Sequence, residues 1–265
     1  MNENSFQPLD CADQSVYGVN SSQRRKPMRL LPLVALCLAA AVRFDAAQDA
    51  KVQQLVLLVP ELGEIRYALS IPDNYEPNNP YPLVLALHPG GARTPYYGGA
   101  FMNRIVQPAL SDWGAIILAP DCPTRAWTSV KAERAVLALL DEIPKRYAVD
   151  RDRILVTGFS LGGRGTWFLA TRHSHIFSGA IPIAGSPGDD SLDGLGSMPV
   201  NIIHSRDDEV VPIEPARKAV KILKLLQNPV KFTELSGIGH FAMSDYINAL
   251  TGAGTWMMQQ WQEEK

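Results

Sequence analysis

Cysteine is scarce in this chain, and its placement excludes a framework of disulfide bonds. The 265 residues include 3 cysteines, at Cys11, Cys37 and Cys122. We expect the first two to be lost with an N-terminal leader, so Cys122 has no partner for an intramolecular disulfide. Stability must then come from a hydrophobic core, and a domain of roughly 220 residues is large enough to bury one.

An excess of charge of one sign is also lacking. The sequence has 25 basic and 27 acidic residues, a formal net charge of -2 with neutral histidines. This balance gives no support for a polyanionic partner, so we expect no binding to nucleic acid. Internal repeats and low-complexity segments are absent from the sequence, and the 46% hydrophobic content is typical of one globular domain.

No hydrophobic run is long enough to span a bilayer comfortably. The run of 13 residues at 30–42 follows a basic stretch, RRKPMR, and ends in the small residues Ala39–Ala41. This order is typical of a secretory signal peptide. We expect a leader with a signal peptide at 1–47, a catalytic domain at 48–265, and a secreted or periplasmic protein without stable membrane association. An uncleaved membrane anchor is the alternative.

The remaining sequence alternates between strand and helix patterns. Two extended runs at 51–59 and 64–72, joined by a short turn, predict an antiparallel hairpin. Continuous apolar runs, of the kind buried on both faces of a sheet, then alternate with helical patterns. Further strands are expected at 82–88, 115–120, 154–159, 179–184, 200–205 and 230–235, and helices after residue 127, at 162–172, at 214–227 and at the C-terminus. Such alternation predicts a mostly parallel sheet with helices on both faces.

One joint between a strand and a helix carries a serine between glycines. In the stretch ILVTGFSLGGRGTW, Gly158 and Gly162 stand two residues on either side of Ser160. A strand that turns directly into a helix strains its corner residue and leaves little room for neighbouring Cβ atoms. The G-x-S-x-G pattern predicts a nucleophile elbow that raises the Ser160 hydroxyl above the sheet. Taken alone, an ordinary glycine-rich turn is an equal alternative.

Later segments supply a base and an acid in the order that such a serine requires. Three carboxylates, Asp207, Asp208 and Glu209, directly follow one expected strand, and His240 lies in a glycine-rich loop after the last strand. Serine is a weak nucleophile, so a neutral imidazole must take its proton while a carboxylate orients the imidazole. We expect Ser160 as nucleophile and His240 as base; spacing alone leaves the three carboxylates open.

The same chemistry needs donors for a developing oxyanion. One donor is expected to be the backbone N–H of Leu161, directly after the nucleophile. The other should come from the loop in LALHPGGAR; Pro89 has no N–H, so Gly90 is the first candidate and Gly91 the second. We expect His88, which ends a buried strand, to brace this loop and not to act as the base.

These motifs together resemble a known family. The pattern D-x-x-R-I followed by T-G-x-S-x-G-G-x-G-T-W, with the LHPGG, HSRDDEVVP and GIGH motifs, covers most of residues 80–245. It resembles α/β-hydrolases of the predicted peptidase and esterase type, related to the phospholipase/carboxylesterase and polyhydroxybutyrate-depolymerase-like families. The resemblance implies an α/β-hydrolase fold. It also implies that the acid lies four residues after the strand-end histidine and four before the proline, at Asp208.

The sequence departs from that family pattern at two places. Pro89 stands where most relatives have glycine. At a helix end, His173-Ser174-His175 stands where tyrosine or histidine followed by proline is usual. Two histidines at this spacing suggest a metal, but with no third ligand in view we expect a solvated helix end. No metal and no cofactor are therefore expected.

Two tryptophans, and the short length of chain between Ser160 and Asp208, give expectations about the substrate pocket. Trp127 and Trp167 are predicted to border the acyl or alcohol pocket, with core packing as the alternative for Trp167. The short interval between Ser160 and Asp208 leaves no room for a cap domain, which predicts an open site.

The sequence thus predicts a secreted serine hydrolase that cleaves carboxylic esters through an acyl-enzyme. Its substrate would be a small or polymer-borne ester of short acyl, feruloyl, acetyl or polyester type. A serine peptidase of related fold, or a non-catalytic binding protein that keeps the fold, are the alternatives.

Overall fold

The computed structural model describes residues 52–91 and 94–263. The chain divides into two units, Met1–Leu38 and Ala39–Lys265, and all described residues belong to the second. The leader expected at 1–47 therefore lies outside the described residues. Within the described ranges, every helix is too short or too polar to cross a lipid bilayer.

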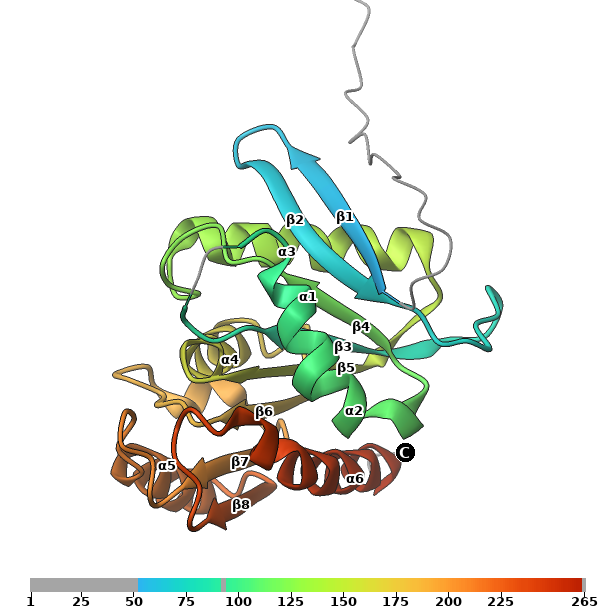
Figure 1. Ribbon diagram of the computed structural model, residues 1–265. Helices are drawn as coiled ribbons and strands as arrows, with labels where there is room; N and C mark the ends of the chain where they lie inside the picture. The colour runs from blue at the N-terminus through green and yellow to red at the C-terminus, as the bar shows by residue number, and fades with distance from the viewer. Residues whose placement is uncertain (1–51, 92–93, 264–265) are drawn as a thin grey trace, which may run out of the picture. The chain divides into compact units, whose positions relative to one another are not determined.

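The described residues form a sheet of eight strands in the order β1-β2-β4-β3-β5-β6-β7-β8 (Figure 1). The strands are β1 (Val52–Val59), β2 (Gly63–Ser70), β3 (Tyr81–Leu87), β4 (Ile116–Pro120), β5 (Val149–Phe159), β6 (Gly179–Ile183), β7 (Val200–Ser205) and β8 (Val230–Leu235). β1 pairs antiparallel with β2, and β2 with β4, whereas every pairing from β4 to β8 is parallel. The predicted hairpin and the mostly parallel sheet are confirmed.

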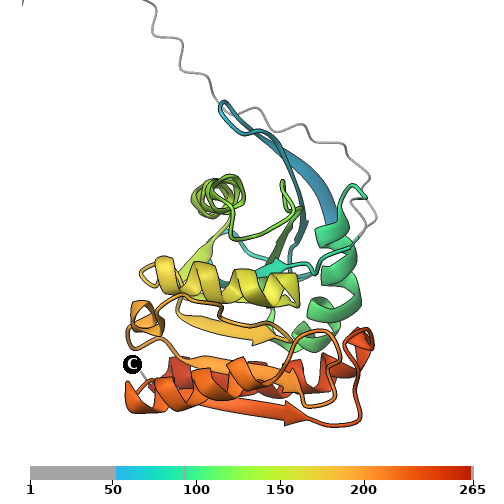
Figure 2. The same ribbon diagram turned by 90° about the vertical axis from the view of Figure 1, so that its left-hand side faces the viewer.

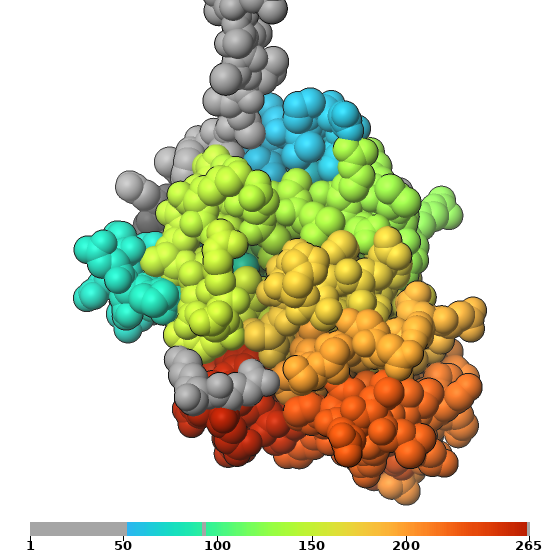
Figure 3. Space-filling view, turned by 180° about the vertical axis from the view of Figure 1, so that it is seen from behind, coloured from blue at the N-terminus to red at the C-terminus, as the bar shows by residue number. Residues whose placement is uncertain are grey.

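Helices cover both faces of this sheet. The longer ones are α3 (Val130–Arg146), α4 (Leu161–Arg172), α5 (Glu214–Leu225) and α6 (Ile247–Glu263). The short ones are α1 (Tyr97–Phe101), η1 (Met102–Val106), α2 (Gln107–Ala109), η2 (Ser111–Trp113), η3 (Leu192–Leu195) and η4 (Met243–Tyr246). Figures 1 and 2 show α3, α4 and α5 on one face and α1, α2 and α6 on the other, and Figure 3 shows the face that the first three cover.

The central strand β3 shows why the sheet is buried on both sides. Its alternate residues Leu83, Leu85 and Leu87 join the core under α3, α4 and α5, while Val84 and Ala86 join the core under α1, α2 and α6. A strand between two helical layers has no polar face, which explains its continuous apolar sequence. Because β3 to β8 run parallel, their carboxyl ends meet at one edge, where ligands bind in open α/β sheets.

The helical segment from Tyr97 to Ala109 was not predicted from the sequence. It is broken into α1, a single wide turn η1 in which the Gln107 N–H bonds to the Met102 carbonyl, and α2. Pro108 has no N–H, so it cannot donate the hydrogen bond of a regular helix at this point. A Cβ on Gly98 would lie 2.4 Å from the Pro120 carbonyl oxygen, so glycine allows α1 to approach β4 closely.

The connections at the carboxyl edge are short within the described ranges. Between β5 and β7 the chain forms α4, β6 and the single turn η3, as Figure 1 shows, and no separate cap domain is inserted there. Between these strands, no inserted domain therefore covers the carboxyl edge.

Candidate active site

Ser160 occupies a strained corner between β5 and α4. Its φ is 55° and its ψ is -112°, a left-handed conformation that costs a non-glycine residue roughly 1–3 kcal/mol. A Cβ on Gly162 would lie 1.9 Å from the Leu87 carbonyl oxygen, so the chain can turn here only with glycine. The Ser160 N–H donates to the Ile183 carbonyl at 2.9 Å, which fixes the corner against β6.

Two later loops bring an imidazole and a carboxylate to this serine. The Nε2 atom of His240 lies 2.8 Å from the Ser160 hydroxyl, and its Nδ1 lies 2.7 Å from a carboxylate oxygen of Asp208. With the Nδ1 proton donated to Asp208, Nε2 is left to accept the hydroxyl proton. The His240 side chain is buried, so little water competes for these contacts.

The three neighbouring carboxylates hold different atoms. Asp208 contacts the His240 ring, whereas Glu209 accepts the His240 backbone N–H at 2.9 Å. Asp207 accepts the Gly237 N–H at 2.5 Å. Asp208 alone of the three is placed to orient the imidazole, and the other two hold the loop that carries it.

Asp208 keeps its charge although it is buried. Burial alone raises its pKa, but hydrogen bonds from His240 and from the N–H groups of Val211 and Val210 outweigh burial, and the pKa falls below its ordinary value. His204 lies behind it, 3.6 Å away, and donates from Nε2 to the Val211 carbonyl. Burial lowers the pKa of His204, so this ring stays neutral and does not compete with His240 for the carboxylate.

The two predicted oxyanion donors lie together beside Ser160. A Cβ on Gly90 would be 3.9 Å from the Leu161 Cβ, so the loop after β3 contacts the start of α4. Leu161 is the first residue of α4, and its N–H has no partner within the helix. Both N–H groups thus belong to backbone segments that meet at the serine.

Comparison with known proteins supports the α/β-hydrolase fold. The family model described as Phospholipase/Carboxylesterase matches residues 120–251, which include Ser160, Asp208 and His240. The crystal structure of a thermostable esterase superposes with a TM-score of 0.71 at 28% identity, covering 79% of this chain and 63% of that one. The chain has the α/β-hydrolase fold.

Curated relatives of this α/β-hydrolase include feruloyl esterases. It is 27% identical to probable feruloyl esterase C of Aspergillus niger (strain ATCC MYA-4892 / CBS 513.88 / FGSC A1513), over 59% of each chain. It is 26% identical to feruloyl esterase C of Emericella nidulans (strain FGSC A4 / ATCC 38163 / CBS 112.46 / NRRL 194 / M139), again over 59% of each. The match thus spans 59% of the length of these relatives.

His88 braces the loop after β3 that carries Gly90. Its Nδ1–H donates to the Pro89 carbonyl at 2.6 Å, and its Nε2 accepts the Cys122 N–H at 3.0 Å. The Trp127 indole N–H donates to the His88 carbonyl at 3.0 Å. Burial lowers the pKa of His88 and keeps the ring neutral, as these two roles require. The predicted bracing role is confirmed, and Pro89, the departure from the family pattern, contributes its carbonyl to the brace.

The prediction that Trp127 and Trp167 border the substrate pocket is wrong. Their side chains are 1% and 0% exposed. Trp127 packs against α4, where a Cβ on Gly165 would lie 2.5 Å from the Trp127 Cβ. The Trp167 indole N–H donates to the Gly185 carbonyl at 3.2 Å. Both rings support the site from the core.

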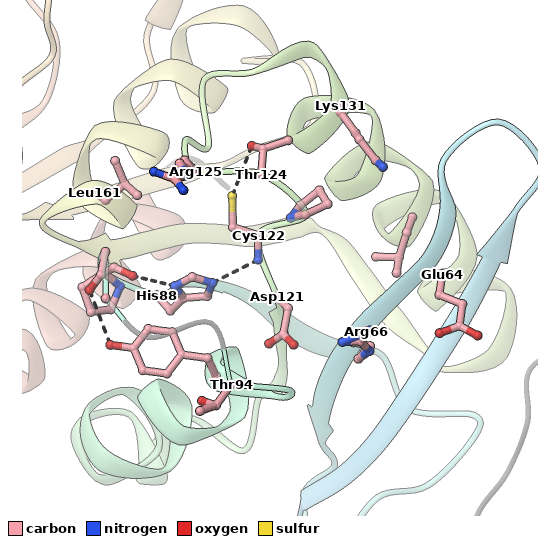
Figure 4. A pocket seen from close by; sticks show the side chains of 16 residues that line it. Glu64, Arg66, His88, Thr94, Asp121, Cys122, Thr124, Arg125, Lys131 and Leu161 are labelled. Atoms are coloured by element: carbon pink, nitrogen blue, oxygen red, sulfur yellow. Dashed lines mark hydrogen bonds between the residues drawn. The ribbon is translucent and has the colours of Figure 1, made fainter.

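A cavity of about 630 Å³ begins beside the oxyanion loop. Its wall includes Gly90, Leu161 and Tyr97, together with Arg125 and Arg66. Figure 4 shows Arg125 on the side of Leu161, and Arg66 and Glu64 farther along the wall. Cationic side chains on this wall were not predicted, because no motif marks them. They come from separate elements that only the fold brings together.

The predicted solvated end of α4 is half wrong. His175 is exposed, but His173 is half-buried and its Nε2 lies 2.8 Å from a Glu133 carboxylate oxygen, which also accepts from Arg172. The pair is therefore part of a link between α4 and α3. Among the residues with described positions, no group of three or more histidine, cysteine or acidic side chains is arranged to hold a metal ion.

Proposed function

We propose that this α/β-hydrolase cleaves carboxylic esters through a covalent acyl-enzyme on Ser160. The observation that carries the proposal is the hydrogen-bonded chain from the Ser160 hydroxyl through His240 to Asp208, with distances of 2.8 and 2.7 Å. Serine needs such a partner because its free hydroxyl is a weak nucleophile at neutral pH.

Each half of the reaction uses the same side chains. The Ser160 oxygen attacks the ester carbonyl carbon while its proton passes to Nε2 of His240, and Asp208 stabilises the imidazolium that forms. The N–H groups of Gly90 and Leu161 donate to the carbonyl oxygen as it becomes an oxyanion. The bond to the alcohol oxygen then breaks, and His240 gives its proton to that oxygen. Water then gives a proton to His240 and attacks the acyl carbon. The bond from that carbon to the Ser160 oxygen breaks, His240 returns the proton to this oxygen, and the acid leaves.

The open carboxyl edge favours esters that need no enclosing cap. Short acyl esters meet this condition, as do feruloyl or acetyl groups on plant polysaccharide and the ester links of a polyester. The names of the feruloyl esterase relatives support the feruloyl class. A secreted or periplasmic location, reached through the leader at 1–47, would bring the enzyme to such polymers. Nucleic acid and stable membrane contact have no part in the proposal.

A fluorophosphonate probe tests the nucleophile directly. We expect the wild-type protein to be labelled, and Ser160→Ala to show no labelling. Ser111→Ala, which changes an exposed serine in η2, is the matched control and should label normally. Absence of labelling in the wild type would favour a non-catalytic binding protein.

Parallel assays separate the ester from the peptide. A p-nitrophenyl ester should be hydrolysed faster than a peptide anilide, because an amine is a poorer leaving group. Faster turnover of the anilide would replace the esterase by a serine peptidase.

A further inference from the structure

Three cationic side chains from separate elements line the cavity beside the oxyanion loop. Arg66 comes from β2, Arg125 from the loop between β4 and α3, and Lys131 from the first turn of α3. All three are exposed. Gly90 and Leu161 line the same cavity, so a ligand within it reaches the proposed oxyanion donors.

These cations have no hydrogen-bond or ion-pair partner among the described residues. Arginines elsewhere behave differently, since most of them are bound to carboxylates. The pairs are Arg134 with Glu61, Arg146 with Glu142, Arg153 with Asp150, Arg164 with Asp190, Arg172 with Glu133, and both Arg206 and Arg217 with Glu234. The cavity is thus a place where the fold leaves positive charge for a group from outside.

The two carboxylates on the cavity wall do not neutralise Arg125. Asp121 is held at the start of α1, where it accepts the N–H groups of Tyr96 and Gly98 at 2.7 and 2.9 Å. Glu64 lies on β2, and Figure 4 shows both carboxylates well separated from Arg125. Arg125 is therefore the cation with the greatest freedom to pair with a ligand.

The position of His240 decides which part of an ester enters this cavity. In the sheet, β7 and β8 lie on one side of β5, and β4 and β2 lie on the other. His240 follows β8, whereas the cavity lies at β4 and β2. The alcohol oxygen must face His240 to take its proton, so the acyl group extends toward the cavity.

We infer that the cavity binds a carboxylate at the far end of the acyl group. The preferred substrates are then half-esters of dicarboxylic acids, with Arg125 as the main partner of the free carboxylate. The planar guanidinium offers two parallel N–H groups to the two carboxylate oxygens. This inference rests on the proposed ester hydrolysis and adds the class of acyl group.

Matched esters test the inference. We would measure kcat/KM for the monomethyl esters of glutaric, adipic and suberic acid, and for methyl esters of monocarboxylic acids of the same length. The wild-type enzyme should prefer the best half-ester by about tenfold, the effect of one hydrogen bond to a charged group. The preference should fall as salt is added, because the pair is partly exposed.

Variants identify the side chains that cause the preference for half-esters. Arg125→Gln should lower the ratio of half-ester to neutral-ester kcat/KM about tenfold, mainly through KM, and Arg125→Lys should recover part of it. Arg66→Gln should have a smaller effect in the same direction. Arg151→Gln, which removes an exposed cation near the start of β5, is the charge-matched control and should keep the ratio.

The outcomes separate this inference from the proposed function. Hydrolysis of neutral esters that depends on Ser160, without preference for half-esters, overturns the inference alone. Preference for esters whose carboxylate is on the alcohol, such as carboxymethyl butanoate, overturns the assignment to the acyl side. Failure to hydrolyse any ester, together with absence of probe labelling, overturns the proposed function and the inference with it.

Discussion

The two sides of Ser160 are built in opposite ways. On the side of β7 and β8, the carboxylates Asp207, Asp208 and Glu209 all bind either the His240 ring or the backbone of its loop. On the side of β2 and β4, the cations of the cavity have no partner among the described residues. The first side fixes one geometry for proton transfer, and the second leaves charge available for recognition. Catalysis and specificity are therefore expected to respond to different substitutions.

The largest effect on kcat should come from the side of β7 and β8, at the carboxylate that contacts the His240 imidazole. Asp208→Asn should lower kcat by about 10⁴-fold, because an amide does not hold His240 in the required tautomer. Asp207→Asn is the matched neighbour and should cost about tenfold or less, since Asp207 binds only the Gly237 N–H. Steady-state kinetics on one ester measures both. Equal losses would contradict the division of roles among the three carboxylates.

On the other side of the serine, the brace of the oxyanion loop gives the next largest effect. His88→Gln should lower kcat by about 10²-fold, because the loop carrying Gly90 loses its links to Pro89 and Cys122. His175→Gln, at an exposed position, should leave kcat unchanged. A loss of kcat as large as that of Asp208→Asn would indicate that His88 takes part in proton transfer. Proton transfer would then not be confined to the side of β7 and β8.

Backbone strain at Ser160, the corner between the two sides, should lower the free energy of unfolding. Ser160→Gly and Ser160→Ala should both be inactive. The free energy of unfolding should be about 1–2 kcal/mol higher for the glycine variant than for the alanine variant, because glycine adopts φ of 55° without strain. Denaturant unfolding of both proteins measures the difference. A more stable alanine variant would show that this corner stores no strain.

The smallest effect concerns a link far from the serine. Burial alone raises the pKa of Glu133, but hydrogen bonds from Arg172 and His173 outweigh it and lower the pKa below 4.5. A carboxyl group whose pKa is lowered in the folded state stabilises the protein at pH values above its ordinary pKa. This stability is lost as the pH falls through the lowered pKa. Glu133→Gln should therefore cost about 0.5–1 kcal/mol at neutral pH and nothing in strong acid. A difference that stays constant with pH would refute this linkage.

Much of the fold could be predicted because its strands are continuous apolar runs. β7 and β8 were predicted with the bounds that the structure gives, 200–205 and 230–235. The segment from Tyr97 to Ala109 was not, because paired glycines, a wide turn and Pro108 interrupt the helical period. Helices of this kind are set by contacts with the sheet, here the close approach of Gly98 to β4.

The site could be predicted only where the mechanism fixes the residue types and their order along the chain. Ser160 and His240 followed from the elbow and from chain order, but Asp208 could be chosen over its two neighbours only through a family resemblance. The burial of Trp127 and Trp167 depends on packing against α4 and the loop after β6, which their positions in the sequence do not reveal. The cavity is assembled from four segments that are separate in the sequence, and it has no local pattern.

Turnover is expected to pass through an ester bond between the acyl group and Ser160. Rapid quenching of the enzyme with a p-nitrophenyl ester, followed by mass spectrometry of its peptides, would detect this acyl-enzyme. We predict one acyl adduct, on the peptide that contains Ser160, and none in Ser160→Ala. Continued turnover by Ser160→Ala, or an adduct on another residue of the wild-type enzyme, would contradict it.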